Sequence, residues 1–296
     1  MKTFGPVKSP VVIGGVGGSG TRVVAEITAL FGFYLGMDLN NASDNLTYTL
    51  LFKRPEWFRN NIDNDKQINT GLSILEKSLI TGKTLSFRER IFLRRAARDM
   101  AKHGHNREGE GKGDWPMQRL SFIKEPHLPD ASEIRGWGWK EPNSHLLIHH
   151  FNDFFPDLKY IHTLRHGLDM AYSSNQQQLY NWAPLFGIGL PEQEKDIPQA
   201  SFRFWVEANR KAIKTGEMLG KEKFLLVNFD ELCSNPLPGV ARIAAFLGIS
   251  PDEESSRAAV KLPVLPASAG RYKSHKGDKF NAEDLNFLQD LGFKYE

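Results

Sequence analysis

Apolar residues fall into two patterns along this chain, short continuous runs and stretches with apolar positions three or four residues apart. The run at 11–15 ends in glycines, which predicts a buried strand that enters a tight turn. Residues 21–31 carry the spacing of a single helix face, and 33–37 read as a second strand. A strand, glycine loop, helix and strand in this order are typical of the start of an α/β fold.

The same alternation of strands and helices resumes after residue 130. We predict strands at 135–140, 158–164 and 223–229 and helices at 144–155, 169–179, 201–219, 238–247 and 282–291. This order predicts a mostly parallel central sheet flanked by helices, with ligands bound beyond the carboxyl ends of the strands. Residues 42–130 are polar and mostly helical, so we expect a helical insertion within a single domain that covers 1–296.

Composition restricts the class of protein. The chain has 296 residues, of which 40% are hydrophobic and 25% charged, as is ordinary for a globular protein. No apolar stretch approaches the roughly 20 residues of a membrane span, and none forms the apolar region of a secretory signal. The single cysteine, Cys233, excludes a disulfide framework and fits a reducing compartment. We therefore expect a cytoplasmic protein.

The charge is small overall but uneven along the chain. A net charge of +3 is too low to predict a nucleic-acid partner. Residues 83–112, however, hold nine basic and four acidic side chains, a local excess of +5. This segment is interpreted either as a solvated helix face or as a cationic surface for an anionic acceptor, lipid headgroup or partner.

A glycine-rich segment separates the first predicted strand from the first predicted helix. It reads Gly14-Gly15-Val16-Gly17-Gly18-Ser19-Gly20-Thr21-Arg22. Glycines let backbone amides approach a ligand closely, and the start of the following helix adds unpaired N–H groups and a positive dipole. Five glycines exceed the needs of a tight turn, so we expect a phosphate or sulfate to bind here.

Of two common nucleotide-binding motifs, one matches this segment and the other does not. A nucleoside triphosphatase loop has Lys followed by Ser or Thr after its last glycine, where this chain has threonine and arginine, so that class is excluded. A dinucleotide fingerprint does fit, with Gly15, Gly17 and Gly20 at the required spacing. Asp38, at the end of the second predicted strand, stands where a ribose-binding acid belongs. An NAD(P)-binding oxidoreductase is therefore an alternative function.

Four segments together resemble the sulfotransferases that use 3′-phosphoadenosine 5′-phosphosulfate (PAPS), particularly bacterial-type members and the carbohydrate and tyrosylprotein branches. Residues 19–22 (Ser-Gly-Thr-Arg) are similar to the family's 5′-phosphosulfate loop. Residues 160–174 resemble its second motif, and 224–249 its late strand–helix segment. Residues 139–142 (Trp-Lys-Glu-Pro) look like a strand-end lysine motif. The resemblance implies a P-loop-like α/β fold and transfer of a sulfuryl group from PAPS to a hydroxyl or amine.

The resemblance also implies a nucleotide site with two phosphate-binding parts. The loop that would hold the 5′-phosphosulfate comprises Gly17, Gly18, Ser19, Gly20, Thr21 and Arg22. In the family, an arginine after a strand and a serine eight residues on hold the 3′-phosphate, which here are Arg165 and Ser173. A planar guanidinium suits that role. A basic, glycine-containing loop near the C-terminus commonly closes the site, and its candidates are Arg271, Tyr272, Lys276 and Gly277.

The resemblance further implies which side chains assist the leaving phosphate. Many family members carry Lys or Arg at the loop position that Gly18 occupies in this chain. Its absence leaves the stabilisation of the developing charge to Arg22, Lys140 and the backbone amides. The resemblance calls for no metal, because the transferred group stays covalently bound until it is displaced.

The acceptor needs a general base, and three carboxylates are candidates. Asp38 is the first, because the carbohydrate and tyrosyl branches keep a carboxylate near this distance past the loop. The alternative for Asp38 is a loop carboxylate that pairs with a neighbouring cation. Glu141 and Asp44 are the further candidates.

Two other features bear on partners. We expect acceptor specificity to lie in the insertion at 42–130, with a glycan, a lipid or a small metabolite as the acceptor. His145 and His149 have the i, i+4 spacing of zinc ligands and lie next to His150, but a third ligand in the zincin pattern is missing. We therefore interpret these residues as surface or interface histidines and expect no metal.

Overall fold

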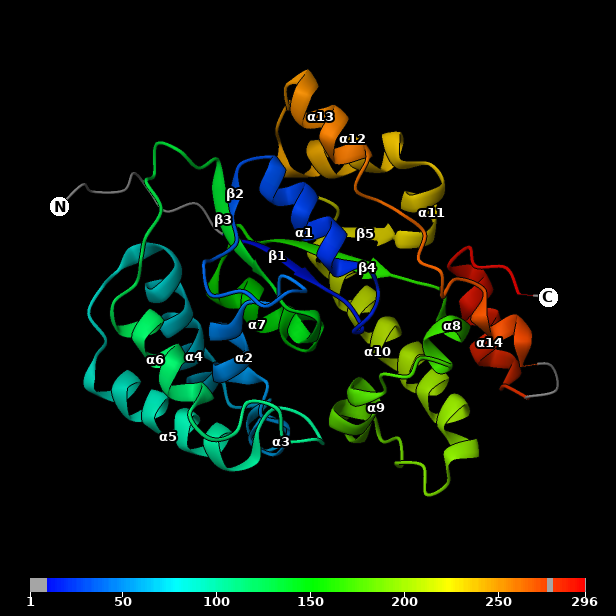
Figure 1. The fold of residues 1–296 in the computed structure, drawn as a ribbon, viewed down its shortest axis with the longest axis horizontal. Coiled ribbons are helices and arrows are strands. Elements are labelled where there is room, and N and C mark those ends of the chain that lie inside the picture. The colour runs from blue at the N-terminus through cyan, green and yellow to red at the C-terminus, as the bar shows by residue number, and fades with distance from the viewer. Residues whose placement is uncertain (1–9, 276–278, 296) are drawn as a thin grey trace.

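The central feature of the fold is a parallel sheet between layers of helices (Figure 1). A computed structural model describes residues 10–275 and 279–295 of the chain. Within these ranges the sheet has five strands in the order β2-β3-β1-β4-β5. The strands are β1 (Val11–Gly14), β2 (Phe33–Tyr34), β3 (Gly136–Lys140), β4 (Lys159–Leu164) and β5 (Phe224–Asn228). The predicted α/β class with a mostly parallel sheet is confirmed.

Alternate residues of the strands pack on opposite faces of the sheet. Val12 belongs to the apolar core below the sheet as drawn in Figure 1, which α7 (Ile148–Phe154) and α10 (Ile197–Leu219) cover. Val11 and Ile13 belong to the core above it. That face is covered by α1 (Thr21–Leu30), α11 (Phe229–Ser234), α12 (Pro236–Leu247) and α13 (Glu253–Val260). Burial on both faces explains why the strands read as continuous apolar runs.

The predicted helical insertion lies between β2 and β3 and packs below the sheet, at the lower left of Figure 1. Its helices are α2 (Leu46–Phe52), α3 (Pro55–Asn61), α4 (Asp65–Glu76), α5 (Phe87–His103) and α6 (Trp115–Lys124), and α4 continues into a π-helical turn, η1 (Lys77–Thr81). A capping box begins α5, because the Ser86 side chain accepts from the Glu89 amide and Glu89 accepts from the Ser86 amide. Glu89 also accepts from Lys77 Nζ at 2.8 Å, which ties α5 to the end of α4.

Three predicted elements differ from the observed ones. The strand expected at 33–37 pairs only over Phe33–Tyr34. The helix expected at 144–155 begins with a 3₁₀ helix, η2 (Pro142–Leu147), before α7. The helix expected at 169–179 is two short helices, α8 (Gly167–Ala171) and α9 (Gln177–Trp182). The break arises because Gln176 Nε2 donates to the carbonyls of Met170, Ala171 and Ser173, which replaces helical hydrogen bonds at this point.

The C-terminal segment crosses the end of the sheet and returns to α8. It contains a short 3₁₀ helix, η5 (Arg271–Ser274), where we expected only loop, and it ends with α14 (Ala282–Asp290) on α10. Across the described ranges, no helix has the length and apolar character that crossing a bilayer requires.

Candidate active site

The glycine segment forms an open loop between β1 and α1. In the described part of the chain, the backbone amides of Gly17, Gly18, Gly20 and Thr21 donate to no protein acceptor. Thr21 is the first residue of α1, so the positive end of that helix adds to the same place. Unpaired N–H groups at a helix N-terminus form a site for an anion such as phosphate or sulfate.

Two positions in this loop require glycine. Gly20 has a φ of 84°, and a Cβ on it would lie 2.2 Å from the ring of Phe229. Gly15 passes so close to β4 that a Cβ would lie 2.4 Å from the Thr163 carbonyl oxygen. The loop therefore sits directly on β4 and α11, which holds its open amides in a constant position.

The order of the strands places one cation on each side of this loop. β1 pairs with β3 on one side and β4 on the other, and all three are parallel. Their carboxyl ends therefore meet at one edge of the sheet. Lys140 ends β3, and Arg165 directly follows β4. The loop lies between these two side chains.

Arg165 is nearly buried and has hydrogen-bonding capacity left. Its Nη2 donates to Ser268 Oγ at 2.9 Å, whereas its Nε has no partner. Burial lowers the pKa of this guanidinium, and the nearby carboxylates of Asp169 and Asp230 oppose that shift. An unpaired N–H on a buried cation is costly, so an arriving phosphate oxygen would bind favourably here.

The C-terminal loop docks beside Arg165. Arg271 donates to the carbonyls of Ser268 and Tyr172, at 3.1 and 3.2 Å. Asp169 of α8 anchors the loop, because its carboxylate accepts from the amides of Gly270 and Tyr272 at 2.8 and 3.3 Å. The loop that we expected over the 3′-phosphate therefore reaches the Arg165 side of the edge.

Of the four remaining predicted nucleotide contacts, the structure describes two. The Tyr272 ring stacks on His166, the residue after Arg165, with centroids 4.6 Å apart. Ser173 follows α8 in a half-buried turn rather than lying inside a helix, and its hydroxyl accepts from the Asn175 amide at 3.3 Å. Lys276 and Gly277 lie outside the described residues.

On the other side of the loop, Lys140 lies in a cluster of charges. Its side chain is only 3% exposed, and Nζ donates to the Asp44 carboxylate and to the Ala42 carbonyl. Glu141 is fully buried and accepts from the amide and the side chain of Asn143. Lys53 Nζ lies 3.9 Å from Glu141, but burial dominates and raises the pKa of Glu141 to about 7. Two of the candidate bases are thus engaged around Lys140.

Asp38 belongs to the same turn as Asp44 but has a different partner. Its carboxylate lies 2.8 Å from Arg119 Nε of α6, without an aligned hydrogen bond between the two atoms. Burial raises the pKa of Asp38 to about 6, against the opposing effect of the Arg119 charge. The carboxylate therefore does pair with a cation, and its pKa lies close to the range that suits a general base near neutral pH.

Arg22 is not brought next to Lys140. It lies in the first turn of α1 with its side chain 58% exposed, and Nε is 3.7 Å from Glu26 on the same helix. Such an exposed ion pair contributes about 0–1 kcal/mol, so it presents little barrier to reorientation toward a bound anion.

The histidines after β3 are mostly buried, which corrects the prediction of a surface group. His145 Nδ1 lies 2.9 Å from the Pro142 carbonyl, and His150 Nε2 lies 2.7 Å from that of Ile62. Helix α7 packs against the sheet, so only His149 of the three is exposed. Among the described residues, no group of three or more His, Cys, Asp or Glu could hold a metal ion.

Comparison with known protein families identifies the family of this chain. A sequence profile described as the sulfotransferase family matches residues 10–254, which is most of the chain. The chain belongs to the sulfotransferase family. No curated protein matches its sequence.

Solved structures agree on the fold of this sulfotransferase. The chain is similar to the sulfotransferase domain of the Synechococcus PCC 7002 olefin synthase, with a TM-score of 0.52 at 14% identity over 99% of each chain. It is also similar to the sulfotransferase domain from the curacin biosynthetic pathway, with a TM-score of 0.53 at 13% identity over 99% of this chain and 100% of that one. At this identity the likeness concerns the fold.

The strand order also argues against a dinucleotide site in the sulfotransferase. In the fold that carries the dinucleotide fingerprint, the second strand lies beside the first, so its terminal acid reaches the same nucleotide. Here β3 lies between β1 and β2, and Asp38 stands beyond the short β2 in a turn held by Arg119. The chain therefore has the glycine spacing of the dinucleotide fingerprint, but it lacks the neighbouring strands that bring the terminal acid to the nucleotide.

Three residues that the sequence analysis did not select help to build the site. Asp169 anchors the C-terminal loop, and Lys53 lies beside Glu141. Gln178 of α9 packs on the glycine loop, where a Cβ on Gly17 would lie 2.8 Å from its Cγ. Of these three residues, only Asp169 could have been found from the sequence, because it closely follows the motif arginine, Arg165. Lys53 and Gln178 meet the site through contacts with distant parts of the chain.

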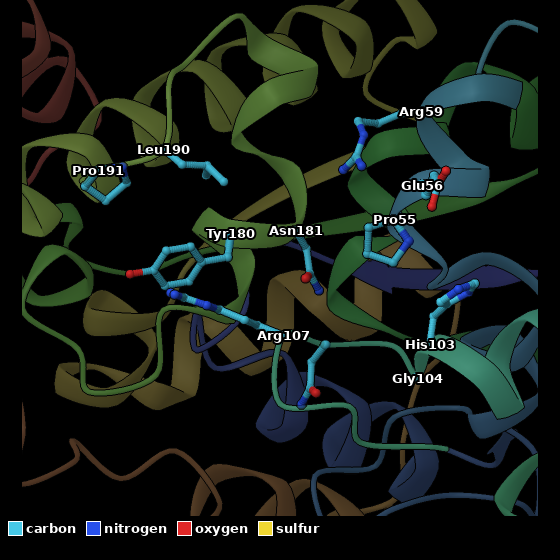
Figure 2. Close-up of a pocket in the computed structure, with 11 residues that line it drawn as sticks. Pro55, Glu56, Arg59, His103, Gly104, Arg107, Tyr180, Asn181, Leu190 and Pro191 are labelled. Atoms are coloured by element: carbon cyan, nitrogen blue, oxygen red, sulfur yellow. The ribbon is translucent and has the colours of Figure 1, made fainter. Parts of the chain in front are cut away.

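A cavity of about 470 Å³ opens beyond α9 (Figure 2). Tyr180 and Asn181 of α9 line it, with Pro55 and Arg59 of α3 opposite. The Arg107 guanidinium lies over the Tyr180 ring, 4.4 Å from its centroid. Helix α9 thus lines this cavity with Tyr180 and Asn181 and packs on the glycine loop with Gln178.

Proposed function

We propose that this sulfotransferase moves the sulfuryl group of PAPS to a hydroxyl or amine of an acceptor. The observation that carries the proposal is the pair of anion-binding points at one edge of the sheet. The open amides of the loop after β1 form one point, and Arg165 after β4 forms the other. PAPS is a nucleotide with a phosphosulfate at its 5′ end and a phosphate at its 3′ position, and these two groups require two such points.

The residues present suit the nucleotide. The amides of Gly17, Gly18, Gly20 and Thr21, together with the α1 dipole, would hold the 5′-phosphosulfate. The unpaired Nε of Arg165 would donate to the 3′-phosphate. Arg271 lies near Arg165 and contacts the carbonyl of Tyr172, the residue before Ser173, while Tyr272 stacks on His166. Ser173, Arg271 and Tyr272 would complete that end.

The chemistry follows from the groups on the other side of the loop. The acceptor oxygen or nitrogen forms a bond to sulfur while the bond from sulfur to the 5′-phosphate oxygen breaks, and 3′-phosphoadenosine 5′-phosphate leaves. We assign the acceptor's proton to Asp38 and the stabilisation of the negative charge on the leaving phosphate to Lys140 and Arg22. Asp44 positions Lys140 through their ion pair.

The assignment of Asp38 predicts a particular pH dependence. A base must be deprotonated to accept a proton, so a pKa of about 6 in the free protein means that kcat/KM falls as the pH drops through about 6. Asp38→Asn should lower kcat/KM by about 100-fold or more and remove this acid limb. Values of kcat/KM measured between pH 5 and 8 test this. Asp44→Asn is the matched control, and the activity of this variant should still fall at low pH. If the activity of Asp38→Asn also falls at low pH, another residue is the base.

Binding of nucleotides tests the proposed function directly. Calorimetry with 3′-phosphoadenosine 5′-phosphate, adenosine 5′-phosphate and NAD should show the first binding most tightly. Loss of the 3′-phosphate removes charge-assisted hydrogen bonds and should weaken binding by about 10–100-fold. Equal affinity for the first two ligands, or tight binding of NAD, would contradict the proposal.

A further inference from the structure

A second cavity lies in the helical insertion, away from the reaction edge. Its volume is about 410 Å³, within the range of small-molecule sites. The wall is formed by the segment that joins η1 to α5, by one face of α5, and by α6 with the residues that follow it. It is lined by Gly82, Lys83, Thr84, Leu85, Arg90, Leu93, Arg94, Leu120, Ile123, Lys124 and Pro126. None of these residues belongs to the glycine loop or to a strand end.

The charged residues that line this cavity all have the same sign. Lys83, Arg90, Arg94 and Lys124 are exposed, and the lining contains no Asp or Glu. None of the four forms a salt bridge within the described residues, although Arg90 Nε donates to the Leu85 carbonyl at 3.0 Å. Glu76 lies near Lys83, and burial raises its pKa. Four cations that converge without a carboxylate among them repel one another unless an anion binds.

The floor beneath these cations is apolar. Leu93, Leu120 and Ile123 are buried, and Leu85 is half-buried. Phe87 precedes Arg90 by three residues and Met117 precedes Leu120 by three, so each shares a helix face with a residue of the lining.

Those two side chains are unusually exposed for their types. Phe87 is 77% exposed and Met117 is 61% exposed. Large apolar side chains that extend the floor of a cavity mark a surface for an apolar ligand. The site therefore combines a cationic rim with an apolar interior and an apolar approach.

We propose that this cavity binds a free amphiphile with one anionic head group and an alkyl chain, such as a long-chain carboxylate. The chain would lie on Leu93, Leu120 and Ile123, and the head group would bind between Arg90 and Arg94 on one wall and Lys124 on the other. The recess favours a free molecule over a membrane surface, because a helix that lies on a bilayer presents an open apolar face rather than a lined cavity. The basic segment at 83–112 thus supplies three of the four cations of a binding site.

Titration calorimetry with monomeric laurate tests the proposal on the full chain. The double variant Arg90→Gln/Arg94→Gln should bind laurate about tenfold more weakly, because two charge-assisted contacts are lost. The double variant Arg95→Gln/Arg98→Gln is the matched control, since it removes the same charge from the same helix at positions that do not line the cavity. The control should bind laurate like the unmodified chain.

Further ligands separate the two parts of the site. Acetate carries the charge without the chain, and dodecanol carries a chain of the same length without the charge, so both should bind at least tenfold more weakly than laurate. Equal laurate affinity of the two double variants would overturn the proposal, as would dodecanol binding that matches laurate. Binding to phosphatidylglycerol vesicles without binding of monomeric laurate would also overturn it and would indicate a membrane-facing surface instead. None of these measurements depends on sulfuryl transfer.

Discussion

Replacing Lys140 with alanine is expected to lower kcat by about 100-fold or more while changing nucleotide affinity much less. The reason is that a cation beside a leaving phosphate acts mainly on the charge that develops in the transition state. Lys140 is nearly buried at the end of β3, and the Gly15 amide donates to the Pro142 carbonyl just beyond it, so the lysine is held close to the loop. Steady-state rates at saturating PAPS, together with calorimetry of 3′-phosphoadenosine 5′-phosphate, measure the two effects separately.

Two variants make this result specific. Lys159→Ala also removes a partly buried lysine from a central strand, but at the opposite edge of the sheet, where Nζ donates to the Phe246 carbonyl. It should leave kcat within about twofold of the unmodified rate. Lys140→Arg keeps the charge beside Asp44 and should recover part of the rate. If Lys140→Ala weakens nucleotide binding at an unchanged kcat, the lysine is a binding contact and not a stabiliser of the transition state.

Replacing Arg165 with alanine should weaken the binding of 3′-phosphoadenosine 5′-phosphate by about 2–4 kcal/mol, which corresponds to roughly 30- to 1,000-fold. The size of the effect follows from burial, because Arg165 is 8% exposed and its Nε has no protein partner. Removing it leaves a phosphate without its charged donor, and within the described residues it also removes the hydrogen bond to Ser268 and a positive charge near Asp169 and Asp230. Calorimetry with 3′-phosphoadenosine 5′-phosphate and with adenosine 5′-phosphate shows whether the lost affinity belongs to the 3′-phosphate. The variant should weaken the binding of the first ligand only.

The matched control for this variant is Arg242→Ala. Like Arg165, Arg242 donates a hydrogen bond through Nη2, here to the Leu226 carbonyl, but it lies on α12 outside the proposed site. It should bind the nucleotide normally. Arg165→Lys should restore only part of the affinity, since an ammonium lacks two parallel donors. Normal binding by both Arg165 variants would show that the second phosphate point lies elsewhere.

The local parts of this fold could be predicted because short-range chemistry determines them. The apolar run, the glycines and the spaced helix positions all lie in one short segment, residues 11–31, and the structure has β1, the loop and α1 there. The same holds for the strand predicted at 223–229, which the structure has as β5 over Phe224–Asn228. The sulfotransferase family was equally accessible, because its motifs are short segments.

Contacts between distant segments decided the rest. The sequence suggested that Asp38 ends a strand near the loop, but β3 pairs with β1 and displaces β2 to the edge of the sheet. Arg119, from the insertion, then binds Asp38. The division of the segment at 169–179 is more local, because Gln176 donates to carbonyls three to six residues before it. For Asp38, a tertiary ion pair and a strand pairing outweighed a weak local preference.

What the sequence by itself determined is therefore most of the strands and helices, the family and the glycine loop between β1 and α1. Only the tertiary structure decided which side chains stand on either side of that loop, with Lys140 and Asp44 on one side and Arg165 with the Asp169-anchored C-terminal loop on the other. The physical reason is that strand order and docking of the C-terminal loop depend on apolar faces and polar partners far apart in the chain, and local spacing carries no information about which of them meet.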